Sequence, residues 1–276
     1  MPGSVAALYR HPIKGFTPER LDAALLEAGA AFPCDRLYAV ENGPSGFDPT
    51  APAFLPKTKF TALASIPALA RAKTVYDPQS RRLTVTAHGR EPFSVNLGDD
   101  AGRQAFAGWL ESFVPAEDLA GPLAVLTTAG PHRFMDDAAG AVSLVNLASL
   151  RELGERLGRE IDPRRLRANV YVDGWPAWSE LSLAPGAIVR LGGVEARVVK
   201  PIVRCAATHV DPASGERDLD LVPALHAHYG HLCCGLYLQI DWGGELRVGD
   251  RASADLSGPM VLPTPEKRER RPRVAA

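Results

Sequence analysis

The chain has 276 residues, of which 46% are hydrophobic and 23% charged, and its formal net charge is −1. A chain of this length can bury a sizeable core in one or two units, and its balanced charge lacks the basic excess typical of nucleic-acid binders. No run of about 18 apolar residues occurs, so we expect neither a membrane-spanning helix nor a membrane partner. Four cysteines are too few for a disulfide scaffold, and no apolar leader follows the N-terminus, which together indicate a reducing, cytoplasmic location.

The first half of the chain has the pattern of a small antiparallel β domain. Apolar segments or period-two alternation predict short strands at residues 5–9, 37–40, 82–86 and 93–95. Residues 101–113 place their large apolar side chains at helical spacing, so we expect an amphipathic helix there, with Trp109 as a core residue. Residues 115–122 form the expected connection between two halves.

The second half combines strands with one well-defined helix. Residues 142–146 predict a strand that leads into a helix at 147–157, with Asn146 as its N-cap and Gly158 as its end. Further strands are expected at residues 168–172, 187–191, 194–199, 236–240 and 246–248. Glycine-rich turns join the last four of these into two hairpins. The whole pattern predicts an α+β, β-rich fold, in which a β-barrel carries helical insertions.

Cys205 is the residue with the clearest chemical potential. Arg204 precedes it, and Thr208-x-x-Asp211-Pro212 forms a turn after it. Because a neighbouring positive charge favours the charged form of a thiol, this residue has a reason to be a thiolate. A thiolate can be a nucleophile, a redox sulfur or a soft metal ligand, and the residues alone leave these roles open.

Three clusters of basic residues accompany this candidate thiolate in the sequence. They are Arg10-His11-Pro12-Ile13-Lys14-Gly15, Asp35-Arg36 and Arg164-Arg165-Leu166-Arg167-Ala168-Asn169. Each places cationic side chains at a strand end, where charge and free backbone N–H groups suit a phosphate or another oxyanion. Taken singly, each cluster is also compatible with solvated surface charge.

Other site types are less well supported by the sequence. One segment contains enough donors for a zinc site: His226, His228, His231, Cys233 and Cys234. The spacing of these donors matches no standard zinc-binding pattern. A thiol protease would pair Cys205 with His209, but no third group orients the pair. Neither a serine-hydrolase motif nor a glycine-rich nucleotide loop occurs.

In these motifs the chain resembles MOSC domain proteins that carry a MOSC N-terminal β-barrel domain. The resemblance rests on segments 11–15, 35–40, 142–150, 165–170, 200–212, 235–237 and 246–250, in that order. It implies an N-terminal β-barrel domain at residues 1–120 and a MOSC domain at 121–257. Because proline and charged residues dominate after Ser257, we expect residues 258–276 to be a disordered tail. The chain departs from common family residues with Gly15 in place of Ser, Cys34 in place of Gly and Ile202 in place of Cys.

The resemblance also implies a molybdenum cofactor, Mo-molybdopterin, held between the two domains. By motif position, Cys205 would be the molybdenum ligand and the catalytic residue. The other cofactor-binding residues that it implies are Lys14, Gly15, Arg36, Gly140, Arg167, Asn169, Arg204 and Tyr237.

The activity implied is that of a molybdenum-dependent oxidoreductase. Such relatives reduce small N-hydroxylated compounds, and this chain would take its electrons from a separate protein, a ferredoxin or a flavin reductase. One alternative is a module that carries or sulfurates the cofactor without turning over a substrate. Another is a member that keeps the fold and has lost the cofactor.

Overall fold

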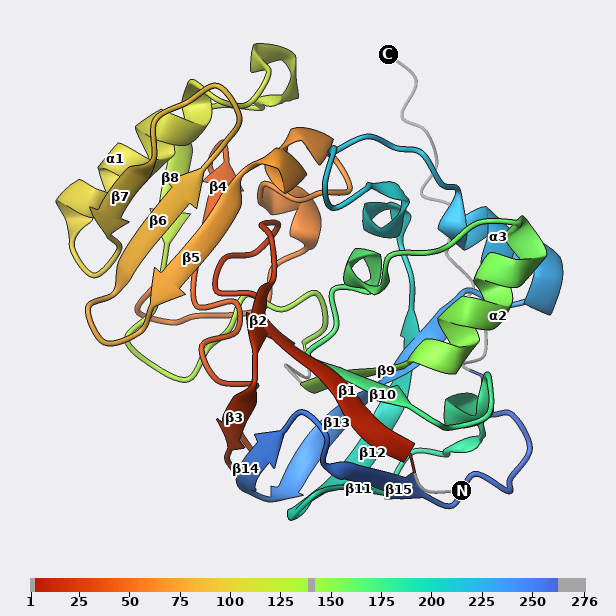
Figure 1. Ribbon diagram of the computed structural model, residues 1–276. Helices are drawn as coiled ribbons and strands as arrows, with labels where there is room; N and C mark the ends of the chain where they lie inside the picture. Colours follow the sequence, from red (N-terminus) through yellow and green to blue (C-terminus); the bar gives the residue numbers. More distant parts are fainter. Residues whose placement is uncertain (1–2, 139–141, 263–276) are drawn as a thin grey trace, which may run out of the picture.

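A computed structural model describes residues 3–138 and 142–262, and its largest element is a closed barrel (Figure 1). Its seven strands follow one another in space as β1 (Gly3–Arg10), β10 (Val170–Asp173), β9 (Val142–Asn146), β13 (Cys233–Trp242), β12 (Val194–Val203), β11 (Ile188–Leu191) and β15 (Arg251–Ala254). The short strand β2 (Glu19–Leu21) also pairs with β1. Neighbouring strands are antiparallel, except that β10 and β9 run parallel.

The first strand of the chain closes this barrel. β1 pairs with β10 on one side, with Leu8 opposite Val170, and with β15 on the other side, with Gly3 opposite Ala252. Both partners come from the second half of the chain. The division at residue 120 stays a prediction, but the barrel made by the second half contains a strand from the beginning of the chain.

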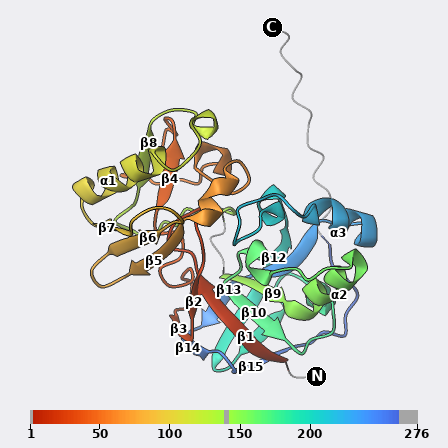
Figure 2. The same ribbon diagram turned by 45° about the horizontal axis from the view of Figure 1, so that its top comes forward.

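A second body packs beside the barrel and contains most of the remaining N-terminal half (Figure 2). A three-stranded antiparallel sheet consists of β5 (Lys73–Asp77), β6 (Arg82–Thr86) and β7 (Phe93–Asn96). Helix α1 (Asp100–Glu111) and the pair β4 (Ala39–Asn42) and β8 (Leu123–Leu126) complete it. The predicted strand at 82–86 and the predicted helix are confirmed, the helix with slightly different ends.

The helices of the second half lie outside the barrel (Figure 1). They are α2 (Leu147–Leu157) and α3 (Leu221–Tyr229). The prediction for the first is confirmed, because the Asn146 side chain accepts a hydrogen bond from Ala148 N and Gly158 ends the helix with φ 65°. Six short 3-10 helices occur in the described residues: η1 (Lys57–Lys59), η2 (Pro67–Arg71), η3 (Ala116–Asp118), η4 (Pro163–Leu166), η5 (Ser179–Ser182) and η6 (Ala206–His209).

One predicted hairpin is wrong. The first glycine-rich hairpin is confirmed as β11 and β12, but β14 (Gly244–Arg247) does not pair with β13, which precedes it. Its partner is β3 (Ala23–Leu26), with Leu246 opposite Ala24. Gly243 permits this, because a Cβ there would lie 2.4 Å from the Leu26 carbonyl oxygen. A local turn signal cannot reveal such a partner from the other end of the chain.

Two large hydrophobic cores fill the two bodies. The first lies in the barrel and beneath α2 and α3, and the second lies between α1 and the sheet of β5, β6 and β7. Trp109 packs at the edge of the second core, as predicted. Within the described residues, no helix is long and apolar enough to cross a membrane.

Candidate active site

Turns from both halves of the chain meet just beyond the end of β1. Arg36 N–H donates to the His11 carbonyl (2.6 Å), and Arg36 Nη2 donates to the Arg167 carbonyl (3.2 Å). The charges of Arg36 and Arg167 both act on the amine of Lys14. Three cations that are far apart in the sequence therefore form one group, which we call the cation cluster: Lys14, Arg36 and Arg167.

The amine of Lys14 is buried, and its side chain is only 4% exposed. Its Nζ donates to the Phe134 carbonyl (3.1 Å) and forms an ion pair with Asp136. Burial lowers the pKa of Lys14, and the attraction of Asp136 opposes this effect only in part. The ammonium is thus held where positive charge is costly.

Arg36 is balanced by a buried carboxylate. Asp35 forms an ion pair with the Arg36 guanidinium and accepts a hydrogen bond from His11 N (2.6 Å). Burial alone would raise the pKa of Asp35, but the charge of Arg36 and the hydrogen bonds from His11 hold it below its usual range. Burial, and then the charge of Arg36, lowers the pKa of His11 to about 3. His11 is therefore neutral and orients Asp35 without adding charge.

Arg167 follows η4 in a left-handed backbone conformation with φ 51°. Its Nη1 donates to the Phe16 carbonyl (2.5 Å), which ties the turn to the N-terminal half. Burial and the charge of Arg36 lower the pKa of Arg167 to about 10. The cation cluster thus sets three positive charges against the carboxylates of Asp35 and Asp136, so a further anion would be favoured there.

Asn169 and Gly15 support this arrangement from within the fold. The Asn169 Oδ1 accepts from both Ser143 N (3.1 Å) and Ser143 Oγ (2.8 Å), and its Nδ2 donates to the Tyr9 carbonyl (3.2 Å). The amide therefore links β9, β10 and β1, and its Nδ2 makes this one hydrogen bond within residues 3–138 and 142–262. Gly15 has φ +87°, and a Cβ there would lie 2.7 Å from the Thr61 carbonyl oxygen. Glycine at this position is a requirement of the backbone.

Arg204, directly after β12, and Tyr237, in the neighbouring strand β13, lie close to the same site. The Arg204 guanidinium donates through Nε (2.8 Å) and Nη2 (2.6 Å) to the Cys234 carbonyl, and through Nη1 to the Leu166 carbonyl (2.8 Å). Burial raises the pKa of Tyr237, the charge of Arg204 opposes this and Asp136 reinforces it. Tyr237 keeps its proton and lies within the electrostatic reach of the cation cluster.

Cys205 is half-buried and lies at the start of η6, directly after β12. Its carbonyl accepts from Thr208 N (3.0 Å) and Thr208 Oγ1 (2.9 Å), which fixes the backbone of this turn. The nitrogens of the Arg204 guanidinium donate to the Cys234 and Leu166 carbonyls rather than to the thiol. Arg204 and Cys205 are thus neighbours in the sequence, and the charged group itself is directed elsewhere. The thiolate form of Cys205 remains a prediction.

The alternative sites are not assembled. Both ring nitrogens of His209 face the start of α3, where Nε2 accepts from Val222 N (3.3 Å) and Nδ1 lies 3.5 Å from Asp220 Oδ1. No nitrogen is left to act as a base for Cys205. In residues 3–138 and 142–262, no group of three or more His, Cys, Asp or Glu side chains is arranged to hold a metal ion.

The vicinal cysteines are packing residues of the barrel. Both Cys233 and Cys234 are buried, and burial raises the pKa of Cys233 and that of Cys234 to about 12. They remain protonated thiols. Of the cofactor-binding residues named from the sequence, Gly140 lies outside the described residues.

Sequence reasoning missed Asp136, which supplies the carboxylate nearest Lys14. Its side chain is 46% exposed, and burial would raise its pKa. The charges of Lys14 and then Arg36 outweigh that effect and hold the pKa below its usual range. The available signal was the pair Asp136-Asp137 shortly before a buried strand, since three converging cations require nearby counter-charges.

Comparison with known proteins identifies both halves. Residues 129–253 match the MOSC domain family, and residues 2–118 match the MOSC N-terminal beta barrel domain family. This chain is a MOSC domain protein. MOSC domains are associated with molybdenum-cofactor binding, so the resemblance inferred from the sequence is confirmed at that level.

Relatives of this MOSC protein include a named reductase component. Mitochondrial amidoxime-reducing component 1 from Mus musculus is 29% identical over 192 residues, which is 61% of this chain and 54% of that protein. The match thus spans about half of the relative's length. Among solved structures, the YUAD protein from Bacillus subtilis is 16% identical with a TM-score of 0.45, covering 91% of this chain and 94% of that one. YiiM from Geobacillus stearothermophilus is 18% identical with a TM-score of 0.33, covering 41% and 53% respectively.

Proposed function

We propose that this MOSC protein binds a molybdenum cofactor and uses it to reduce small N-hydroxylated compounds, with electrons from a separate donor protein. The observation that carries the proposal is the buried cation cluster beside the Cys205 turn. The named relative, an amidoxime-reducing component, gives the substrate class.

The residues of the site fit such a cofactor. Lys14 and Arg167 both have pKa values lowered by burial, and each repels the neighbouring Arg36. A phosphate group would offset this charge and accept several charge-assisted hydrogen bonds. Cys205 would add a sulfur ligand, which is soft and suits a metal that prefers sulfur donors.

The cofactor, when bound, would supply the two-electron redox chemistry. The side chains of Lys14, Arg36 and Arg167 would hold its phosphate, and Cys205 would bind its metal. Tyr237 keeps its proton because burial raises its pKa, so its hydroxyl can donate a hydrogen bond. Reduction of an N-hydroxyl group by two electrons consumes two protons and releases one water molecule.

Metal analysis and turnover test this function together. We expect molybdenum near one per chain in protein made by a cofactor-producing host, and its loss in Cys205→Ala. The loaded protein should reduce an amidoxime or hydroxylamine with a reduced viologen dye as the electron source. Molybdenum bound without any turnover would favour a carrier or sulfuration module, and a wild-type protein without molybdenum would refute both.

A further inference from the structure

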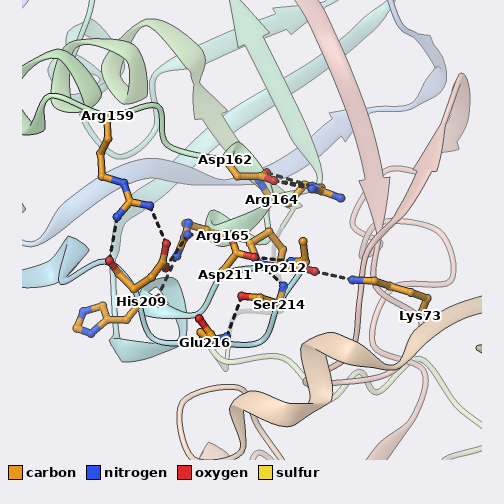
Figure 3. Close-up of polar contacts among 12 residues, drawn as sticks. Lys73, Arg159, Asp162, Arg164, Arg165, His209, Asp211, Pro212, Ser214 and Glu216 are labelled. Atoms are coloured by element: carbon orange, nitrogen blue, oxygen red, sulfur yellow. Dashed lines mark hydrogen bonds and ion pairs between the residues drawn. The ribbon is translucent and has the colours of Figure 1, made fainter. Parts of the chain in front are cut away.

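Cys205 begins a long connection that we call the Cys205 loop, residues 205–218. It contains η6 and a tight turn, and it runs between the two bodies of the molecule before α3 begins. Figure 3 shows its central part, with the side chains that hold it. The position of the proposed metal ligand depends on what fixes this loop.

Asp211 organises the turn of the loop through one of its two carboxylate oxygens. Its Oδ1 accepts from Ala213 N (2.9 Å) and Ser214 N (2.7 Å), and its backbone N–H donates to the Glu216 carbonyl (2.7 Å). The other oxygen, Oδ2, is directed away from the turn toward Arg165 (Figure 3). The residue that shapes the loop is thus also the one that attaches it.

Arg165 holds the loop at three places. Its Nη1 donates to the His209 carbonyl (3.1 Å), and its Nη2 lies 3.0 Å from Asp211 Oδ2 and 2.7 Å from Asp218 Oδ1. The side chain of Arg165 is only 2% exposed, so these ion pairs are screened little by solvent. They lie near the middle and the end of the Cys205 loop.

The same residue is part of the turn that leads into Arg167, one member of the cation cluster. Arg165 lies in η4, two residues before Arg167. The residue before the loop is attached to η4 as well, because Arg204 Nη1 donates to the Leu166 carbonyl (2.8 Å). The two side chains that flank Leu166 therefore have different roles. Arg165 holds the Cys205 loop, and Arg167 belongs to the cation cluster.

The N-terminal body holds the loop by packing and by polar contacts: Val210 is buried in its core, and two hydrogen bonds join the surfaces. Lys73 Nζ donates to the Pro212 carbonyl (2.6 Å), and Arg217 Nη2 donates to the Ala64 carbonyl (2.6 Å). Each is a single contact from an exposed side chain, whereas Arg165 makes three from a buried one. Among the polar contacts of the loop, Arg165 thus makes the most extensive set from a buried position, and Arg159 adds an ion pair with Asp218 (2.7 Å).

We propose that Arg165 is a positioning residue that sets the place of Cys205 relative to Arg167. The inference rests on the proposed function, in which these two residues hold the metal and the phosphate of one group. A rigid guanidinium with several donors suits this task, because it fixes direction as well as distance. Without it, the loop would keep its turn but lose the hydrogen bond and the ion pairs that join its middle and its end to η4.

The test uses the full-length, cofactor-free protein and compares Arg165→Met with Arg164→Met. Arg164 is the matched control, since it is the adjacent residue and pairs with Asp162 in a more exposed position (Figure 3). Two rates are measured, the alkylation of Cys205 by iodoacetamide and the hydrogen exchange of amides 206–218. We expect Arg165→Met to raise both roughly tenfold and Arg164→Met to leave them within about twofold.

Further variants keep the test decisive. Arg165→Lys retains the charge but not the fork of donors, so it should restore part of the protection. If Arg165→Met fails to fold, Asp211→Asn and Asp218→Asn each remove one charged partner from the loop side and should raise the same rates. A folded Arg165→Met protein with wild-type alkylation and exchange rates would overturn the proposal.

The molybdenum content separates this proposal from the proposed function. If the wild type contains molybdenum, Arg165→Met should lose most of it, although Cys205 and the cation cluster are intact. If the wild type contains none, the proposed function fails, while the alkylation and exchange rates still decide the role of Arg165.

Discussion

At the scale of single residues, Lys14 is a buried charge whose use lies outside the stability of the fold. In Lys14→Met the partner Asp136 can be hydrated, because its side chain is 46% exposed. We therefore expect the free energy of unfolding of the cofactor-free protein to change by less than about 1 kcal/mol. Molybdenum retention should fall at least about tenfold, because one charge-assisted contact is lost.

The control for this prediction is Lys200→Met, which removes an ion pair with Asp137 from a more exposed position. It should leave both unfolding in urea and metal content close to wild type. Equal metal content in Lys14→Met and the wild type would contradict an anion-binding role for Lys14.

Glu180 is a buried carboxyl group that has no role in the proposed chemistry. It accepts from Asn146 Nδ2 (3.1 Å) and from Ser149 Oγ (2.9 Å). Burial raises its pKa from its ordinary value of 4.5 to about 7. Between these values the folded state binds more protons than the unfolded state, so this residue makes stability fall as the pH rises through that window.

We expect this loss to be on the order of 3 kcal/mol for the wild type between about pH 5 and about pH 8. Glu180→Gln keeps the shape and one acceptor oxygen but cannot titrate. Urea unfolding of both proteins at the two pH values measures the difference. The same pH dependence in the variant and the wild type would show that Glu180 does not titrate in this range.

At the scale of elements, the turn after β1 depends on Gly15. A side chain there would have φ +87° and would place its Cβ 2.7 Å from a backbone oxygen of Thr61. Gly15→Ala should therefore lower the free energy of unfolding by about 2–4 kcal/mol. Gly89→Ala is the control, since Gly89 has φ +73° and nothing within 4 Å of the added Cβ, and it should cost only about 1 kcal/mol. Equal losses in the two variants would mean that the contact with Thr61 relaxes freely.

At the scale of the whole molecule, β1 and β3 join the beginning of the chain to the barrel of its second half. A fragment of residues 121–262 would lack the strand between β10 and β15 and the partner of β14. Because open strand edges leave backbone groups unpaired, we expect the fragment to aggregate or unfold without cooperativity. The same fragment fused through a flexible linker to residues 1–31 should recover a cooperative thermal transition. A fragment that unfolds cooperatively without those residues would show that the barrel closes by itself.

Short-range features of this protein could be predicted because they are written in neighbouring residues. The helix at Leu147–Leu157 was predicted with both ends correct, since the Asn146 cap and Gly158 are local signals. The strand at 142–146 and the first glycine-rich hairpin follow from period and turn chemistry in the same way. The motif positions Lys14, Arg36 and Arg167 also proved to share one electrostatic site.

The remaining features depend on contacts between distant parts of the chain. The sequence shows Arg204 next to Cys205, but only the fold directs its guanidinium to the carbonyls of Cys234 and Leu166. Likewise, the sequence shows that Asn169 has an amide group. Only the packing of β9 against β10 places its oxygen where it accepts from Ser143.

The sequence by itself thus determined the class of the fold and the local elements, and it named the residues that we propose to bind an anion and a soft metal. The tertiary structure decided that β1 closes the barrel, that Asp136 faces Lys14 and that Arg165 holds the Cys205 loop. The physical reason is that periodicity and capping act over a few residues. Strand pairing and buried ion pairs instead join residues as far apart as Leu8 and Val170, whose meeting depends on the closure of the whole barrel.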